Sequence, residues 1–533
     1  MTQEPVRPGS QRRDDRAVGP IIATLACAGV VASLMYTLTI PLIPDLPRLL
    51  HSSASNTAWA VTATLLGASV APPIAGRLGD MYGKKRLMLV SLVLLIVGSL
   101  LCATTSSLLP VVSGRALQGM ASGLIPLGIS MMRDVLPPAR LGAALGLMSS
   151  SLGIGGALGI PFSALVAQHA DWHVLFWGAA VLGVIMMVVL WWVVPAPPPS
   201  GRDEAAGRAR FDTVGAIGLL VGLLAVLLVI SKGSDWGWTT PTTLGLGLGG
   251  VVVLLVWGWW ELRVPTPVVD LRVTARRQVL MTNLTSVIVG IAMYALSLVV
   301  PQLMQIPTGT GFGFGASMVV AGLCFAPFGV VMVLASPITA RIIATFGAKA
   351  SLMIGVLIVA IGYAVGIAFL NAIWQVIVVC AIVGLGVAFA YAAMPTLIMA
   401  AVPPTETAAA NGLNTLMRAL GTSIASALIG VVLSHLTTTY AGAEVPTLSG
   451  FRVTFVIATV AAVAALAVAA FIPGRRAPGA ALPTPRPETA PAVVDLLSTG
   501  STGVAVFDPA EVIAPGSTGV ATLDAADGPV ARS

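Results

Sequence analysis

The sequence predicts an all-α integral membrane protein with 14 transmembrane helices, arranged as two pseudo-symmetric six-helix bundles plus a two-helix insert. Three observations predict this fold. The composition is 56% hydrophobic and only 9% charged, which excludes an ordinary soluble protein. The chain contains fourteen long apolar runs, each of about 18 residues or more. A charged turn between two of these runs recurs, in degenerate form, in the second half of the chain.

The apolar runs predict membrane-spanning helices, because a hydrocarbon core of roughly 30 Å needs about 20 residues in helical form. The runs are continuously apolar rather than alternating, which excludes the strands of a membrane β-barrel. They lie at approximately residues 20–43, 57–76, 87–106, 108–132, 142–167, 174–195, 213–231, 242–260, 279–301, 316–340, 350–370, 373–400, 408–435 and 452–472.

The recurring turn indicates a duplication. Its first copy is Ala71–Arg86 and its second is Ala335–Lys349. A second repeated motif has nearly the same sequence separation, since a Leu-Pro-Pro at 136–138 and a Val-Pro-Pro at 402–404 each precede an apolar run. Duplicated helix bundles in membranes are typical of transporters. Six positions are identical between the copies, namely Ala71/Ala335, Pro73/Pro337, Ile74/Ile338, Arg77/Arg341, Gly83/Gly347 and Lys85/Lys349.

This offset pairs the first six spans with the last six and leaves the seventh and eighth as an insert. The terminal region is rich in Pro, Ala and Thr and lacks the apolar residues to bury a core, so it is expected to be disordered. No cleavable signal is expected at the polar, Arg-rich beginning. The predicted segments are 1–19 (cytoplasmic), 20–195 (first bundle), 213–260 (insert), 279–472 (second bundle) and 474–533 (cytoplasmic tail).

The net charge of +7 is interpreted as a topology signal and not as a nucleic-acid-binding surface. With the N-terminus inside, nearly all Lys and Arg fall in loops on one side, as the positive-inside rule requires. Both termini are therefore expected in the cytoplasm, and the protein in the cell (inner) membrane. The other side holds only Arg48, Lys232 and Arg452.

No cofactor or metal is predicted. The four cysteines are scattered within apolar spans, without the spacing of a disulfide framework or a metal site. No phosphate-binding loop of the Gly-x-x-x-x-Gly-Lys-Ser/Thr type is present, so drive by ATP is not expected.

Two motifs carry a family resemblance. Residues 76–86, Gly-Arg-Leu-Gly-Asp-Met-Tyr-Gly-Lys-Lys-Arg, resemble the signature that follows the second helix in the major facilitator superfamily, and residues 114–119, Gly-Arg-Ala-Leu-Gln-Gly, resemble its fourth-helix motif. Fourteen spans with an insert, and the segment Glu261–Arg272, resemble the drug:proton antiporter branch. The resemblance implies a transporter of the multidrug efflux type, not an enzyme. It also implies parallel bundle repeats, which are established for this superfamily.

Asp80 and Arg77 lie where the second span leaves the membrane. A carboxylate there can cap the positive end of a neighbouring helix or pair with a facing arginine. The resemblance implies a latch that closes the cytoplasmic side and opens when the bundles rock. The alternative is a solvated turn that only sets the topology. The latch residues are Gly76, Arg77, Asp80, Gly83, Lys84 and Arg86.

Arg115 falls inside the fourth span, where a cation costs roughly 2.5–3.5 kcal/mol on insertion scales, so it should face the interior with a partner. The resemblance makes Arg115 a coupling residue, and Gln118 shares its helix face. The alternative is an arginine whose long side chain reaches the outer surface. Asp45 and Asp134, at span ends, are further coupling candidates.

Small residues form a stripe along the fifth span and predict close helix packing. The resemblance relates this stripe to the antiporter motif of exporters, although Pro161 stands one place late and Ser163 replaces a glycine. Generic helix packing explains the stripe equally well. The residues are Gly155, Gly159, Pro161 and Ser163.

No Asp or Glu lies deep inside a span, and Met35 stands where the antiporter branch has an aspartate. A methionine cannot titrate, so the source of energy stays open. Polar residues within spans could line a central cavity or could equally join helices. The cavity candidates are Met35, Tyr36, Asn283, Tyr294, Gln302, Gln305, Asn411, Asn414 and Arg418.

Together these features predict a secondary active transporter that exports lipophilic or cationic drugs, or hydrophobic metabolites, by alternating access with proton antiport. The expected partners are a lipophilic small molecule, protons and the lipid bilayer, with no nucleic acid, and the protein is expected to be a monomer. One alternative is an exporter or flippase of lipids or hydrophobic natural products with atypical or no proton coupling. An alternative of another class is a transport-dead membrane sensor.

Overall fold

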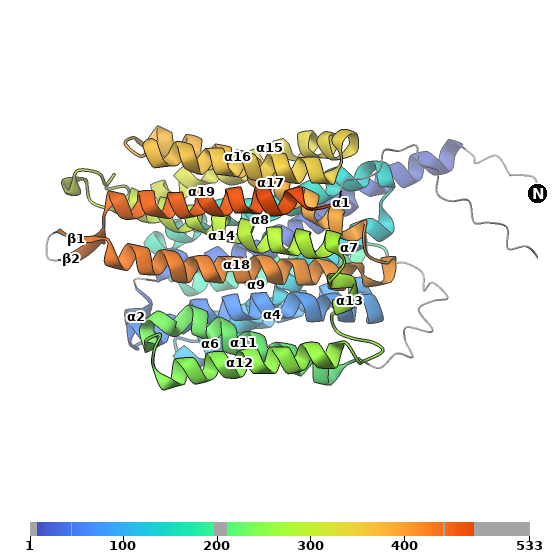
Figure 1. Ribbon diagram of the computed structural model, residues 1–533, viewed down its shortest axis with the longest axis horizontal. Helices are drawn as coiled ribbons and strands as arrows, with labels where there is room; N and C mark the ends of the chain where they lie inside the picture. Colours follow the sequence, from blue (N-terminus) through green and yellow to red (C-terminus); the bar gives the residue numbers. More distant parts are fainter. Residues whose placement is uncertain (1–7, 44, 197–210, 441–442, 474–533) are drawn as a thin grey trace, which may run out of the picture. The chain divides into compact units, whose positions relative to one another are not determined.

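The computed structural model describes residues 8–43, 45–196, 211–440 and 443–473, and this part of the chain is almost entirely helical. Within it, thirteen helices are long and apolar enough to cross a membrane. Figure 1 shows these helices running side by side. The predicted all-α membrane fold is therefore confirmed, whereas the predicted tail at 474–533 lies outside the described residues.

The fourth predicted span, 108–132, is divided into two shorter helices, which is why thirteen long helices and not fourteen are found among the described residues. α6 (Leu108–Met120) and α7 (Leu124–Val135) are joined by a 3₁₀ turn, η2 (Ala121–Gly123). Neither helix is long enough to span a bilayer alone, but the two together are. The turn consists of small buried residues that pack on α4 and α5.

The first part of the chain, up to residue 196, forms α1 (Pro8–Thr37), η1 (Ile40–Leu42), α2 (Leu46–Leu49), α3 (Ala54–Thr57), α4 (Trp59–Tyr82), α5 (Lys84–Ala103), α6, η2, α7, α8 (Pro138–His169) and α9 (His173–Val193). From residue 211 the chain forms α11 (Thr213–Trp236), α12 (Pro241–Glu261), α13 (Leu271–Thr274), α14 (Arg277–Gln305), η3 (Thr308–Thr310), α15 (Met318–Phe346), α16 (Ala348–Ala368), α17 (Ile373–Met399), η4 (Pro404–Glu406), α18 (Thr407–His435) and α19 (Leu448–Ala470). A short antiparallel hairpin, β1 (Thr437–Tyr440) and β2 (Ala443–Pro446), joins α18 to α19.

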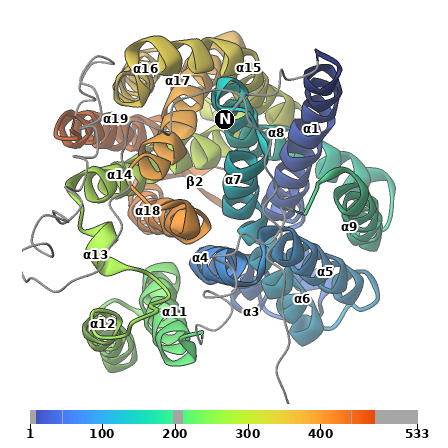
Figure 2. The same cartoon turned by 90° about the vertical axis from the view of Figure 1, so that its right-hand side faces the viewer.

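Figure 2 looks along the helices and shows two groups. Helices α1 to α9 lie on one side and α14 to α19 on the other, each around its own apolar core. The two groups meet mainly where α4 packs on α18 and where α8 packs on α15 and α17. The pair α11–α12 lies outside, and α11 contacts both α4 and α18.

The charged turn is more helical than the apolar runs predict. The second span was expected to end near residue 76, but α4 continues to Tyr82, so Arg77 and Asp80 belong to its last turns. The helix ends at Gly83, whose φ of +101° is open to glycine and strained for other residues. We call the end of the bundle that carries this residue the Gly83 end.

Candidate functional site

At the Gly83 end, the carboxylate of Asp80 caps the N-terminus of α18. Its two oxygens accept hydrogen bonds from the backbone N–H groups of Ala408 (3.3 Å) and Ala409 (2.9 Å). These N–H groups have no partner within their own helix, and the positive end of the helix dipole favours a negative charge there. The side chain of Asp80 is only 2% exposed. One residue of α4 thereby joins the first helix group to the second.

Small residues let α4 and α18 approach each other backbone to backbone at the same end. A Cβ on Gly76 would collide with the carbonyl of Ala408, and a Cβ on Gly412 would collide with the carbonyl of Pro72. Arg133 of α7 adds a hydrogen bond of 2.6 Å to the hydroxyl of Thr407. The Gly83 end is thus closed by close packing and by polar contacts between the two groups.

Lys84 connects the carboxylates at this end. Its ammonium lies 2.6 Å from Asp134 Oδ2 and 3.8 Å from Asp80 Oδ1, and its side chain is 10% exposed. The positive charge compensates the buried Asp80 without displacing it from α18. The coupling candidate Asp134 therefore lies beside the turn and away from Arg115, whereas Arg86 is exposed.

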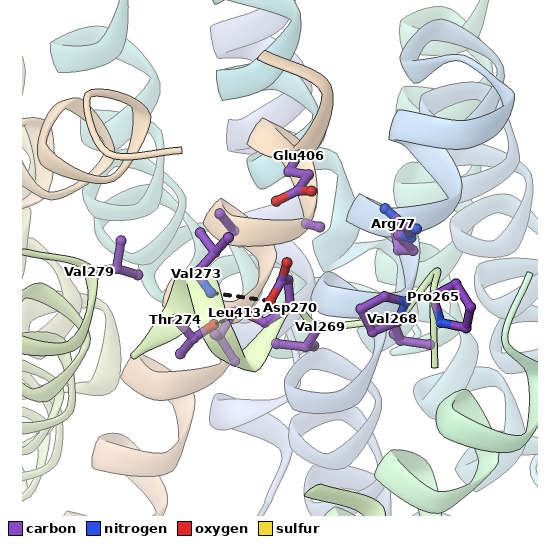
Figure 3. Close-up of a pocket in the computed structure, with 13 residues that line it drawn as sticks. Arg77, Pro265, Val268, Val269, Asp270, Val273, Thr274, Val279, Glu406 and Leu413 are labelled. Carbon is purple, nitrogen blue, oxygen red and sulfur yellow. Dashed lines mark hydrogen bonds between the residues drawn. The ribbon is translucent and has the colours of Figure 1, made fainter. Parts of the chain in front are cut away.

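Arg77 points into a small pocket of about 80 Å³ between α4, α18 and the chain before α14. Figure 3 shows it across this pocket from Glu406 and Asp270. Asp270 is already occupied in capping α13, since it accepts hydrogen bonds from the N–H groups of Arg272 and Val273. The Nε atom of Arg77 is buried without a hydrogen-bond partner within the described residues.

Arg115 is buried in a cage of neutral hydrogen-bond acceptors. It is 1% exposed, which excludes the reading in which it reaches the outer surface. Its guanidinium donates to Gln118 Oε1 (2.7 Å), Thr39 Oγ1 (3.0 Å) and the carbonyl of Ala60 (3.4 Å). Gln118 in turn donates to the hydroxyl of Ser99 at 2.8 Å. These contacts tie α6 to α4, to α5 and to the chain after α1.

Asp45 is separate from this cage. Its side chain is 59% exposed and lies 3.7 Å from Arg48, at a solvent-accessible helix end. The structure does not bring the two coupling candidates Asp45 and Asp134 together with Arg115. Within the described residues, Arg115 has no carboxylate partner.

The small-residue stripe of α8 packs against α1. Side chains at Gly155 and Gly159 would collide with Ser33 and Thr37, and the hydroxyl of Thr37 donates to the carbonyl of Gly155 at 3.2 Å. Ser163 donates to its own helix at Gly159. On its other side α8 meets α15, where Pro161 lies against Gly322. The stripe therefore lies at a contact between two helices of the first group.

Two of the five amides predicted for a cavity, Asn283 and Asn414, join helices. Asn414 donates to Asn283 Oδ1 at 2.9 Å and to Ser286 Oγ at 2.6 Å, which connects α18 to α14. Asn411 donates to the carbonyl of Thr407 in its own helix. Tyr294 and Gln302 are half-buried on α14.

Gln305 requires a correction. It was expected among the cavity residues, but it is exposed and donates to the carbonyl of Pro301 in its own helix. The reason is its position, since it is the last residue of α14.

Arg418 lies where the two groups meet. It projects from the middle of α18, is 9% exposed, and places its guanidinium 4.6 Å from the ring centre of Tyr391 on α17. Its charge reaches Tyr36 of α1, which lies beside Ser122 of η2. Met35 is fully buried one residue before Tyr36. Among the predicted cavity residues, Tyr36 of the first group is therefore near enough to Arg418 of the second to be influenced by its charge.

The sequence reading missed four polar residues of these sites. Tyr391 is a single phenol in a long apolar run, a signal that could have been used. Thr39, Ser99 and Ser122 gave no signal, because small hydroxyls in helices commonly bond to their own backbone.

Comparison with known proteins identifies the family to which the chain is similar. A family model described as Major Facilitator Superfamily matches the chain over residues 25–320 and 282–516. Among solved structures, the proton:xylose symporter XylE superposes with a TM-score of 0.59 at 14% identity, covering 86% of this chain and 97% of that one. This likeness supports the fold.

Sequence relatives include named exporters. The chain is 26% identical to the multidrug export protein EmrB of Escherichia coli over 76% of this chain and 78% of that protein. It is 24% identical to multidrug resistance protein 3 of Bacillus subtilis, over 72% of this chain and 73% of that protein. It is also 24% identical to the uncharacterised transporter YhcA of Bacillus subtilis, over 63% of this chain and 62% of that protein.

Proposed function

Because this chain belongs to the major facilitator superfamily, we propose that it exports lipophilic small molecules by alternating access and exchanges them for protons. Its family makes it a multi-pass membrane transporter and not an enzyme, as the sequence predicted. Drug export is named for one relative, the multidrug export protein of Escherichia coli, and drug resistance for another, multidrug resistance protein 3 of Bacillus subtilis. We place the Gly83 end in the cytoplasm, because the basic residues gather there.

The observation that carries this proposal is the contact of Asp80 with α18 across the two helix groups. Hydrogen bonds to a charged group contribute about 1.5–3 kcal/mol each, and 1.4 kcal/mol changes an equilibrium tenfold. A latch of this strength favours the closed Gly83 end strongly, yet thermal motion can still open it. Alternating access needs this balance, since each end must close and open in every cycle.

We propose Arg115 as the residue that couples proton movement to the helix movement. Its positive charge is buried among neutral acceptors from its own helix and two neighbouring elements, so a small shift of α6 would change its hydrogen bonds to Thr39 and Ala60 together. Among the carboxylates at span ends, Asp80 is buried and Asp45 is exposed. Asp80 is therefore the acid that we expect to exchange the proton.

Uptake of lipophilic dyes, ethidium and fluorescein, into energised inside-out vesicles tests the proposal, since uptake into such vesicles corresponds to export from the cell. We expect active movement that stops when a protonophore collapses the proton gradient. Arg115→Ala should abolish export while membrane insertion stays normal, because the cage loses its centre. Gln278→Ala is the control, since that side chain only donates to the carbonyl of Leu397. Export that ignores the proton gradient would overturn proton exchange, and full activity of Arg115→Ala would overturn its role.

A second candidate function is export or flipping of lipids or hydrophobic natural products, with little proton coupling. It is favoured by an apolar pocket of about 340 Å³ between α4, α5, α6 and α11, lined by residues such as Leu66, Ile74 and Leu220. Leu220 and Val90 of its lining are also exposed on the outer surface, where lipid would contact them. Movement of a labelled lipid, with no movement of ethidium, would favour this function. The absence of any transported substrate would favour the sensor.

A further inference from the structure

Arg418 is the interior arginine whose charge is least compensated by the protein. Its hydrogen bond within the described residues is a long one, 3.5 Å from Nη2 to Thr415 Oγ1 in its own helix. Arg115, by contrast, donates to three acceptors, one of them at 2.7 Å. Burial of a guanidinium inside a membrane protein is unfavourable unless the charge finds a partner. Arg418 therefore retains donors that a ligand could use.

The surroundings of Arg418 come from both helix groups. Tyr391 and Thr415 belong to the second group, whereas Tyr36 belongs to the first. The hydroxyl of Tyr391 donates to Met293, so its ring face is left for the guanidinium. A ligand between these residues would touch both groups at once, and its environment would change whenever the groups move apart.

No acidic residue of the described part of the chain forms an ion pair with Arg418. Within the described residues, the acids of the two helix groups lie towards helix ends, as Asp80, Asp134 and Asp45 do, and no ion pair joins a carboxylate to Arg418. A cationic ligand would meet an uncompensated positive charge of the same sign. An anionic group would supply the missing counter-charge, and guanidinium groups bind planar carboxylates through two parallel hydrogen bonds.

We propose that the substrate is a lipophilic organic anion, and that Arg418 binds its negatively charged group while Tyr36 and Tyr391 contact its apolar body. This inference rests on the proposed export function and narrows the expected substrates from cations to anions. Aromatic rings and soft apolar side chains around one charged group are typical of sites for bulky amphiphilic ligands. In a cell with a negative interior, the membrane potential also favours the exit of an anion.

Two xanthene dyes of similar shape and opposite charge, fluorescein and pyronin, test the inference in inside-out vesicles that contain the full chain. The wild-type chain is expected to transport fluorescein at least about tenfold faster than pyronin. Arg418→Gln should lose most fluorescein transport and keep or gain pyronin transport. Arg418→Lys, which keeps the positive charge, should retain part of the fluorescein transport. Arg48→Gln, which removes an 81% exposed positive charge, should behave as wild type.

The outcomes separate this inference from the function on which it rests. If wild-type vesicles transport pyronin but not fluorescein, export stands and the anionic substrate is overturned, whether or not the variants fold. If a folded Arg418→Gln transports fluorescein at the wild-type rate, the role of Arg418 is overturned. If neither dye moves and ethidium and lipid also stay in place, both proposals are overturned.

Discussion

The two copies of the charged turn share a skeleton and differ in what they join. In both, a glycine with positive φ (Gly83 at +101°, Gly347 at +87°) separates two long helices. In both, the matching lysine donates to a backbone carbonyl of the last helix in its own group. Lys85 bonds to Trp191 and Lys349 to Ala470, each at 2.8 Å.

The difference lies one turn earlier in the helix. Asp80 of the first copy caps a helix of the other group, whereas the second copy has the exposed Ala344 at the matching position. The contacts that hold each group together are thus found twice. Of the two copies of the turn, the first is the one that makes a polar contact with the other group, and opening the Gly83 end must break the hydrogen bonds of Asp80 together with that of Arg133 to Thr407.

The largest effect is expected when Asp80 is replaced. Asp80→Ala removes both hydrogen bonds to α18 and should destabilise the closed Gly83 end by about 3–6 kcal/mol. The initial rate of dye export, measured with the dye that the wild-type chain transports, should fall at least about tenfold. The matched change in the second copy, Ala344→Asp, adds an exposed carboxylate and should alter export by little, within about 0.5 kcal/mol. Equal losses at the two positions would contradict a single latch.

A smaller effect is expected from the helix contact beside the latch. Gly76→Ala places a methyl group against the carbonyl of Ala408, so α4 and α18 must separate, at a cost of about 1–3 kcal/mol. The matched position is Ala340, whose surroundings are less crowded, since even a Cβ added at Gly142 would be in ordinary van der Waals contact with its methyl group. Ala340→Gly should cost only about 0.5–1 kcal/mol through helix propensity. Thermal denaturation of the purified variants and their export rates would check the order, which the opposite ranking would refute.

The smallest effect, and an equal one, is expected from the two lysines. Lys85→Ala and Lys349→Ala each remove one exposed hydrogen bond within a group, worth less than about 1 kcal/mol. Export should remain near the wild-type rate in both variants, with similar small decreases in the denaturation temperature. If Lys85→Ala stopped export while Lys349→Ala did not, the two contacts would not be equivalent.

The sequence predicted the long helices well, because continuous apolar runs of this length have few other structures open to them. It placed the end of the second span too early, since Arg77 and Asp80 are polar residues that still continue the helix. It also could not predict the division of the fourth span at Ala121–Gly123, where the run stays apolar. Packing of small residues on neighbouring helices decides that geometry.

The candidate site was harder to predict, because lipid and protein interior are equally apolar and leave little pattern on a span. In the sequence, Gln305 and Arg418 are both polar residues at or inside apolar runs. In the structure, Gln305 is exposed at a helix end and Arg418 is buried between the groups. The environment of Arg115 depends on Thr39, Ala60 and Ser99, which come from three separate elements. Such long-range neighbours cannot be read from local spacing.

The contacts of α11 affect how the free energy changes as the Gly83 end opens. Leu219 and Leu223 of this helix pack between Leu66 of α4 and Leu416 of α18. Contacts between aliphatic side chains have no preferred direction, so their energy changes gradually as helices slide. The hydrogen bonds of Asp80 depend steeply on distance and angle and vanish within a short displacement. The free energy of opening therefore rises steeply at first, while the directional hydrogen bonds break, and then changes little as the aliphatic contacts slide. Most of the barrier lies in the first part of the displacement.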